Sequence, residues 1–441
     1  MAKINAASGS RWRPVLLFFL LLAAGSGAFA AEPGGGVLQV PAAALWSESF
    51  DPQRATDAWI QTLSAEQRER SDAYYEGGYW LQLWDVVYGL AVAWLLLASR
   101  VSTSLRDRLE KWTRRRWLQS LLFGAAYVVA AWVLTLPLTV YSEYFREHQY
   151  GLANQSFGPW FGEQLTSLAV AIVLGGAFIA GLYAAIQRAG RSWWAWAGVV
   201  TSVFLVFVII ISPVFIAPLF NKYEALAPSL ARDSLLSLAR ANGIPADNVY
   251  AFDASKQTTR ISANVSGALG TTRISLNDNL LYRTSLPEIR AVMAHEMGHY
   301  ALNHTWRLLI YLSLLFLIGF LFVHVSFDRF LRRWGIRVGV RGLGDVAGLP
   351  AVAAIFSVFM LLATPVRNTV VRTAEAEADI FGLNAAREPQ GFASAAMRLS
   401  TYRKINPSAL EEALLYDHPS GRTRVQMSMR WLAENRPTAQ R

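Results

Sequence analysis

The sequence contains no cysteine among its 441 residues. Disulfide bonds are therefore excluded, and any metal site has to use His, Asp or Glu side chains. Charged residues are also scarce, at 16% against about 25% in typical soluble domains. Together with a hydrophobic fraction of 53%, this scarcity excludes a disordered or fibrous chain and argues against a soluble one.

The apolar residues gather in long runs. A helix needs roughly 20 apolar residues to cross the core of a bilayer, and six internal segments meet or approach this length. Several of them begin or end at Trp, which anchors at the membrane interface. We therefore predict a mainly α, polytopic membrane protein. The six segments are 79–98, 117–140, 164–187, 193–217, 306–324 and 347–365.

Residues 1–30 allow two interpretations. Lys3, Arg11 and Arg13 precede an apolar stretch, which ends in an A-x-A-like cleavage site at residues 25–30. This order of features favours a cleavable signal peptide, although the stretch also fits an uncleaved first membrane helix. The bundle would have six membrane helices after cleavage and seven without it.

The remaining chain divides around the membrane segments. We expect a polar extracytoplasmic segment with a helical run near 57–71, a four-helix membrane region, a small α+β domain, two membrane helices and a helical C-terminal segment; these parts span residues 31–78, 79–217, 218–305, 306–365 and 366–441. In the α+β domain, an amphipathic helix over 226–241 precedes short β-type runs at 248–252, 261–266 and 272–276. A capping box formed by Ser285 and Glu288 predicts the start of the next helix.

This next helix carries the motif H-E-x-x-H at residues 295–299. His295 and His299 are four residues apart, so both imidazoles leave one face of the helix and can share one zinc ion. Glu296 lies beside them, where it can take a proton from metal-bound water. The alternative is a pair of partly buried histidines on an amphipathic helix, which is disfavoured because the chain has only six histidines.

A catalytic zinc site needs a third protein ligand, and residues 372–379 offer one. Glu375 and Asp379 are four residues apart and share a helix face, whereas Glu377 points away. Spacing alone leaves His304 and His148 as rivals to Glu375. His304 lies five residues after His299 and is rotated off the metal face, so we expect a structural role for it.

Motifs across residues 79–430 resemble those of the type I CAAX prenyl protease family of integral-membrane zinc metallopeptidases. The similar stretches are 215–223, 294–300 with 303–304, 375–381, 418–424 and, more weakly, 147–155. The resemblance implies that His295, His299 and Glu375 bind zinc and that Glu296 is the catalytic base. It also implies that the membrane helices enclose a water-filled chamber, which the metal faces.

The same resemblance implies further roles in catalysis. Asp379 would orient a ligand histidine, Asn264 and His418 would stabilise the oxyanion, and Arg424 would lie near the metal. Residues 261–266 resemble an edge strand that pairs with an extended peptide. The aromatic cluster that usually follows the asparagine in this family is absent from residues 264–270, so the resemblance does not extend to a prenyl preference.

We therefore predict a zinc metalloendopeptidase that binds one Zn²⁺ and acts on a misfolded or membrane-associated peptide. Its other partner is the lipid bilayer, and we expect no nucleic acid, since the basic residues cluster beside membrane segments. An intramembrane-cleaving protease would need a metal-binding Asp on a later membrane helix, but Asp328 and Asp345 lie in a basic loop. A shorter quality-control peptidase would have fewer helices before the motif. A catalytically silent scaffold or adaptor would not need Glu296.

Lysine and arginine predict the orientation in the membrane. Four alternating segments (1–14, 99–116, 188–192 and 325–346) hold 17 of these residues in 59 positions, whereas 31–78 and 141–163 hold 4 in 71. The positive-inside rule places the basic set in the cytoplasm. We therefore predict a bacterial inner-membrane protein whose site opens to the periplasm.

Overall fold

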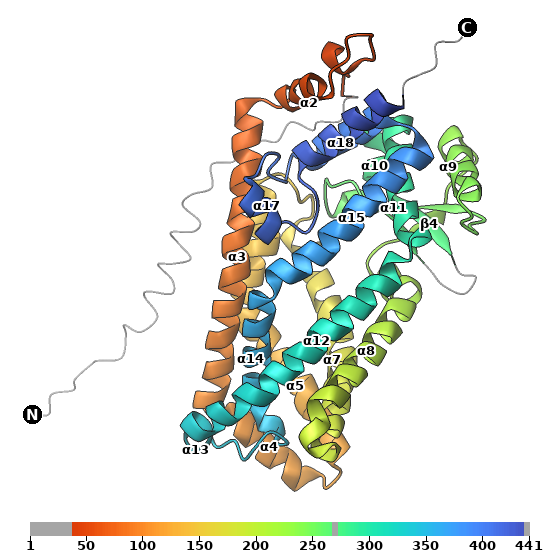
Figure 1. The fold of residues 1–441 in the computed structure, drawn as a ribbon. Coiled ribbons are helices and arrows are strands. Elements are labelled where there is room, and N and C mark those ends of the chain that lie inside the picture. The colour runs from red at the N-terminus through yellow and green to blue at the C-terminus, as the bar shows by residue number, and fades with distance from the viewer. Residues whose placement is uncertain (1–37, 267–271, 436–441) are drawn as a thin grey trace, which may run out of the picture.

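The computed structural model describes residues 38–266 and 272–435. Long helices form most of the molecule, and a small sheet with several shorter helices lies at one end (Figure 1). Within the described residues, five helical spans are long and apolar enough to cross a membrane, or six if one bent helix pair counts as a span. The prediction of a polytopic, mainly α protein is confirmed. The expected signal peptide or first helix at residues 1–30 lies outside the described residues.

The membrane spans follow the predicted apolar segments. The helices that form them are α3 (Ala65–Ala98), α5 (Arg116–Thr139), α7 (Phe157–Arg188), α8 (Trp193–Ile211), α12 (His304–Phe330) and the bent pair α14 (Leu349–Leu362) and α15 (Thr364–Ala386). The bend of 57° between α14 and α15 coincides with Pro365 in the first turn of α15. Proline lacks the N–H that would continue the hydrogen-bond ladder, so the last predicted segment, 347–365, ends in a change of direction.

The helix α3 runs through the predicted boundary between residues 78 and 79. This helix begins at Ala65, well before its apolar part. A capping box starts it: the Gln67 N–H donates to Ser64 Oγ (3.1 Å), and the Ser64 N–H donates to Gln67 Oε1 (3.0 Å). The helical run expected near 57–71 is therefore divided between α2 (Pro52–Gln61) and α3.

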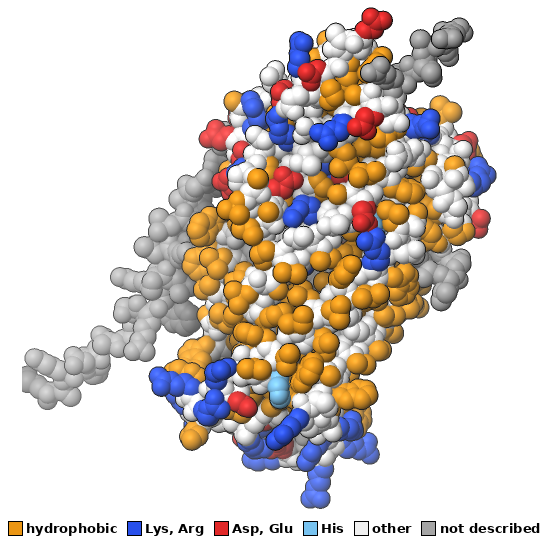
Figure 2. All heavy atoms as spheres, viewed as in Figure 1, with side chains coloured by type: hydrophobic (Ala, Val, Ile, Leu, Met, Phe, Trp, Pro, Cys, Tyr) orange, Lys and Arg blue, Asp and Glu red, His pale blue; other side chains and the backbone are white. Residues whose placement is uncertain are grey.

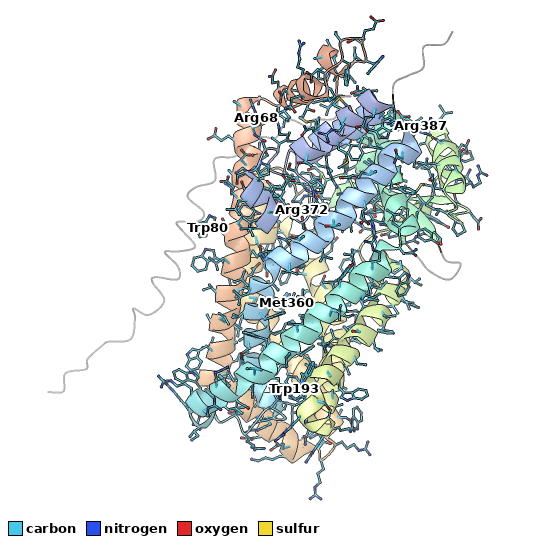
Figure 3. All side chains as sticks on the ribbon, in the orientation of Figure 1. Arg68, Trp80, Trp193, Met360, Arg372 and Arg387 are labelled. Atoms are coloured by element: carbon cyan, nitrogen blue, oxygen red, sulfur yellow. The ribbon has the colours of Figure 1, made fainter. Side chains whose placement is uncertain are left out.

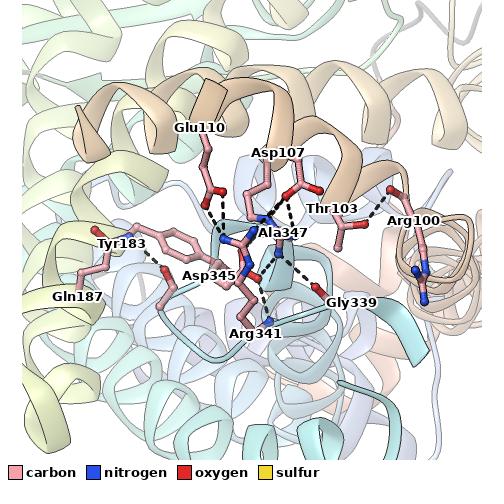
Figure 4. A network of polar contacts seen from close by, with 12 residues as sticks. Arg100, Thr103, Asp107, Glu110, Tyr183, Gln187, Gly339, Arg341, Asp345 and Ala347 are labelled. Carbon is pink, nitrogen blue, oxygen red and sulfur yellow. Dashed lines mark hydrogen bonds and ion pairs between the residues drawn. The ribbon is translucent and has the colours of Figure 1, made fainter. Parts of the chain in front are cut away.

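A buried ion pair holds the end of the bundle that lies farthest from the sheet, where α4 (Val101–Trp112) and α13 (Ile336–Val338) are located (Figure 1). Arg106 Nη1 lies 2.5 Å from Asp345 Oδ2, and the two side chains are only 7% and 5% exposed. Arg341 extends the network to Glu110 and donates its backbone N–H to Asp345 (Figure 4). The carboxylate of Asp345 therefore fixes α4 against the loop before α14.

Replacing Asp345 with Ala is expected to destabilise the fold by up to about 3–5 kcal/mol, because the buried guanidinium of Arg106 would lose its buried partner and keep only Asp107, whose side chain is 49% exposed. Thermal unfolding of the detergent-solubilised protein measures this loss. Asp328→Ala is the matched control, since Asp328 is an exposed carboxylate on the same side and exposed changes usually stay within about 0.5 kcal/mol. Equal shifts in both variants would contradict a stabilising role for the network.

The small sheet has four strands in the order β1-β2-β4-β3. Their bounds are β1 (Tyr223–Ala225), β2 (Val249–Phe252), β3 (Ala263–Ser266) and β4 (Arg273–Asn277). β2 and β4 are parallel, and the outer pairs are antiparallel, so β3 lies at an edge. Three strands match the predicted β-type runs. The sequence analysis missed β1, because three residues are too few for an alternating pattern to be recognised.

The helices around the sheet complete this domain. They are α6 (Arg146–Gln149), α9 (Leu230–Ala241), α10 (Asp278–Arg283), α11 (Leu286–Ala301), α16 (Pro389–Leu399), α17 (Ala409–Leu415) and α18 (Gly421–Glu434). The core side of α11 buries Met293 and Met297 against Ile274 and Leu276 of β4. Arg372 on α15 (Figure 3) donates to the backbone carbonyls of Tyr416 and, at 2.8 Å, Glu412. This contact fixes α17 and the residues after it beside α15.

Candidate metal centre

Two glycines allow α11 and α15 to cross at close range. A Cβ atom on Gly382 would lie 2.9 Å from the backbone nitrogen of His295, and one on Gly298 would lie 3.1 Å from the Cα atom of Ala378. A side chain at either position would force the helices apart. The absence of these side chains brings the acidic residues of α15 to the H-E-x-x-H face of α11.

Three side chains converge at this crossing. The Nε2 atoms of His295 and His299 are 3.1 Å apart. Glu375 places Oε2 3.3 Å from His295 Nε2 and Oε1 3.4 Å from His299 Nε2. Among the described residues, these three form a group whose ligand atoms all lie within 4.8 Å of one another. Two imidazole nitrogens and a carboxylate oxygen are a donor set that binds a transition-metal ion.

Asp379 and Arg424 support this group from behind. Asp379 Oδ1 lies 2.8 Å from His295 Nδ1, a contact that fixes the ring and leaves Nε2 for a metal. Arg424 is 7% exposed; it donates to Asp379 Oδ2 at 2.9 Å and to Glu375 Oε2 at 3.1 Å. The structure therefore places both residues next to the predicted ligands.

His418 also reaches the centre, from the loop between α17 and α18. Its Nε2 atom lies 3.2 Å from Glu375 Oε2, and its Nδ1 atom lies 2.8 Å from Asp417 Oδ1. His418 thus faces the same space as the two histidines of α11. Asn264 is not brought into this group: it lies in β3 opposite Ser275 and is not among the residues that line the cavity at the centre.

His304 has a position that the sequence analysis did not predict. It is 1% exposed, and its Nδ1 atom lies 2.9 Å from Nδ1 of His299. An offset of five residues would turn it away on a continuous helix. However, α11 ends at Ala301, and Asn303 adopts a left-handed conformation (φ 56°) before α12 begins. This turn returns His304 to the back of the His299 ring.

The other rivals and neighbours lie outside the group of three. Glu377 points away from it and binds His304 Nε2 at 2.9 Å and Arg307 at 2.6 Å. His148 faces two backbone carbonyls, those of Tyr144 (2.7 Å) and Gln155 (2.9 Å), in a loop between membrane helices. Neither residue contributes to the candidate metal centre.

A cavity of about 290 Å³ opens onto the centre. Its lining includes His295, Glu296, His299 and Glu375 on one side and Ser262 and Ala263, at the start of β3, on another. Burial raises the pKa of the Glu296 carboxyl above its ordinary value. A carboxylate with a pKa closer to neutrality is a stronger base toward water, and it sits here beside the candidate ligands.

A helical membrane protein with this centre belongs to the class of membrane metalloproteases. Comparison with family models supports the assignment over most of the chain. Residues 52–222 match the model for the CAAX prenyl protease N-terminal region with five membrane helices, and residues 229–431 match the model of peptidase family M48. The chain belongs to the CAAX prenyl protease family, peptidase family M48.

Individual relatives agree with this assignment. The metalloprotease YhfN of Bacillus subtilis (strain 168) is 28% identical over 80% of this chain and 83% of its own length. CAAX prenyl protease 1 of Saccharomyces cerevisiae is 32% identical over 47% of this chain and 46% of its own length. The crystal structure of Ste24p from S. mikatae shares the fold, with a TM-score of 0.70 at 23% identity over 83% of this chain and 89% of that one.

Proposed function

We propose that this chain is a zinc-dependent endopeptidase in which Glu296 is the general base. The observation that carries the proposal is the convergence of His295, His299 and Glu375 beside a cavity that Glu296 also lines. Two histidines and one glutamate are a ligand set of catalytic zinc sites, which keep a further position open. We assign one Zn²⁺ per chain to these three residues.

Each residue near the centre then has a chemical task. Bound zinc supplies an activated water and polarises the scissile carbonyl. Glu296 accepts a proton from the attacking water and delivers it to the leaving amine. Asp379 accepts a hydrogen bond from the Nδ1–H of His295, so that Nε2 keeps its lone pair for zinc. Arg424 offsets part of the negative charge of the Asp379 and Glu375 carboxylates, to which it donates.

We assign oxyanion stabilisation to His418, whose Nε2 atom faces the centre. A donor of this kind contributes roughly 2.7–4 kcal/mol in comparable sites. For Asn264 we propose a role through its strand rather than its side chain. The free edge of β3 can bind an extended peptide through main-chain hydrogen bonds. The substrate is then an unfolded or membrane-associated peptide segment that enters the cavity as a strand.

The proposal predicts that purified protein contains one zinc per chain and cleaves a generic unfolded peptide. Removal of zinc by a chelator is expected to abolish cleavage, and addition of zinc is expected to restore it, because Glu296 alone cannot activate water sufficiently. Elemental analysis and a peptide-cleavage assay measure the two quantities. A zinc-loaded protein that cleaves no peptide would favour the alternative, a catalytically silent scaffold or adaptor in membrane quality control.

We also propose that the site opens to the periplasm of a bacterial cell. Lysine and arginine residues gather at the end of the molecule opposite the sheet, beyond an apolar band (Figure 2). Exposed members of this set are Arg108, Lys111, Arg114, Arg115, Arg191, Arg332, Arg333 and Arg337. The positive-inside rule places this end in the cytoplasm, and the metal centre belongs to the other end.

Because the chain has no cysteine, single introduced thiols report orientation without background. Asn435→Cys, at the end near the metal centre, is expected to react with a membrane-impermeant thiol reagent once the outer membrane is permeabilised. Arg114→Cys, at the basic end, is the matched control and is expected to react only after the inner membrane is opened. Both residues are exposed. The reverse pattern of labelling would place the site in the cytosol.

A further inference from the structure

A second, larger cavity of about 720 Å³ adjoins the metal centre. It shares four lining residues with the cavity at the centre, namely Ile261, Ser262, Tyr402 and Arg403. The two cavities therefore adjoin each other at the residues that precede β3. A peptide bound at the metal centre has room to continue into the larger space.

Four arginines line the larger cavity, which we call the arginine chamber: Arg146, Arg260, Arg367 and Arg403. Among the described lining residues, Asp417 is the single carboxylate, and it lies 2.8 Å from His418 Nδ1. The walls therefore carry an excess of positive charge. Such an excess in a concave site attracts anionic groups of a ligand.

The arginines differ in how their charge is balanced. Arg260 forms an ion pair with Glu147 at 2.7 Å. Arg146 donates to the backbone carbonyl of Tyr74, and Arg367 donates to the side-chain carbonyl of Asn368 at 3.3 Å. Within the part of the chain that the structure describes, no carboxylate lies within ion-pair distance of Arg146, Arg367 or Arg403. Arg146 is buried and packs on the ring of Tyr74, whereas the guanidinium groups of Arg367 and Arg403 are available to a carboxylate, which they can bind in bidentate geometry.

The direction of β3 indicates which part of a substrate reaches these groups. β3 runs from Ala263 to Ser266, and Arg260, Ile261 and Ser262 precede it on the side of the arginine chamber. A peptide that pairs antiparallel with the free edge of β3 runs in the opposite sense. Its C-terminal end therefore points toward Ser262 and Arg260, and the residues after the scissile bond enter the arginine chamber.

We propose that the arginine chamber is a subsite for a carboxylate located on the C-terminal side of the scissile bond, with Arg403 and Arg367 as its specificity-determining residues. This inference rests on the proposed peptidase function and on antiparallel pairing with β3. The carboxylate can come from an Asp or Glu side chain or from the C-terminus of the peptide. Both sources present the same planar anion to the guanidinium groups.

Three fluorogenic peptides of one sequence distinguish the sources. The first has neutral side chains and an amidated C-terminus, the second adds one Glu after the scissile bond, and the third has a free C-terminal carboxylate instead. With the full-length, zinc-loaded protein in detergent, we expect kcat/KM for at least one carboxylate peptide to exceed that of the neutral peptide by about tenfold. The peptide with the higher kcat/KM identifies which source of the carboxylate is preferred. Because the attraction is electrostatic, the preference is expected to shrink as the salt concentration rises.

Variants then connect the preference to the arginine chamber. In Arg403→Gln and Arg367→Gln, the ratio of kcat/KM between the carboxylate and neutral peptides is expected to fall to below about threefold. Arg430→Gln is the matched control, because Arg430 is exposed on α18 and does not line either cavity; its ratio is expected to equal that of the unmodified protein. Arg403→Glu is expected to reverse the preference toward a peptide with Lys in place of Glu.

The ratio is taken within each variant, so a partial loss of folded protein does not change it. A ratio near one for both carboxylate peptides in the unmodified protein would overturn the proposal. So would a high ratio that persists in both Arg403→Gln and Arg367→Gln. Failure of the peptidase assignment looks different, because the unmodified protein would then cleave none of the three peptides.

Discussion

The variant Glu296→Gln is expected to retain its zinc and to lose at least a factor of about 10²–10⁴ in peptide hydrolysis, the range typical of general-base catalysis. The amide has nearly the shape of the carboxylate but cannot accept a proton from water. The three candidate ligands, His295, His299 and Glu375, are untouched by the change. Elemental analysis of the purified variant and its cleavage rate on an unfolded peptide measure both parts of the prediction.

The contrasting variant is His295→Ala, which removes a candidate ligand and the partner of Asp379. It is expected to lose most of its metal along with its activity, whereas Glu296→Gln loses activity alone. If Glu296→Gln kept more than about a tenth of the unmodified rate, where general-base catalysis predicts a far larger loss, Glu296 would not be the base. A loss of zinc in Glu296→Gln would instead mean that this residue helps to hold the metal.

The sequence predicted most of this centre because its parts obey local rules. H-E-x-x-H is a pattern within one helix, and the phase of a second helix separates Glu375 from Glu377. What the sequence could not show is the crossing that brings the two helices together. That crossing depends on the small size of Gly298 and Gly382, and a single glycine in a helical pattern has many possible causes.

The features that the sequence did not predict depend on turns of the chain or on contacts between distant segments. His304 supports His299 only because Asn303 adopts a left-handed conformation, whereas helical phase alone turned it away. The break between α2 and α3 depends on the capping box at Ser64. The arginine chamber brings together Arg146, Arg367 and Arg403 from distant parts of the chain. The spacing of residues along the sequence cannot predict such a long-range contact.

The fold and the substrate preference of this chain depend on different parts of the structure. The membrane region and the region that holds the metal centre both match family models, over residues 52–222 and 229–431. The arginine chamber lies beside the metal centre and shares four lining residues with the cavity there. One fold can carry different sites, which is how a single scaffold serves several functions. Specificity in this chain is therefore best sought beside the centre rather than in it.

The variants Glu375→Ala and Glu377→Ala are expected to differ sharply in zinc content, although they remove the same group from the same helix two positions apart. Residues with this spacing lie about 200° apart around a helix. Glu375 faces His295 and His299, whereas Glu377 binds Arg307 and the back of the His304 ring. We expect Glu375→Ala to be purified with far less than one zinc per chain and to be inactive, and Glu377→Ala to keep its zinc.

Metal analysis of the two purified variants decides between these roles, and competition with a chelator gives the order of their affinities. Glu377→Ala also tests how far support extends behind the centre, since it leaves His304 without its carboxylate partner. Loss of such an outer contact typically costs about 10–100-fold in metal affinity, which a chelator titration detects while stoichiometric zinc is still bound. Equal loss of zinc in both variants would contradict the assignment of Glu375, because the two side chains cannot face one ion from opposite sides of α15.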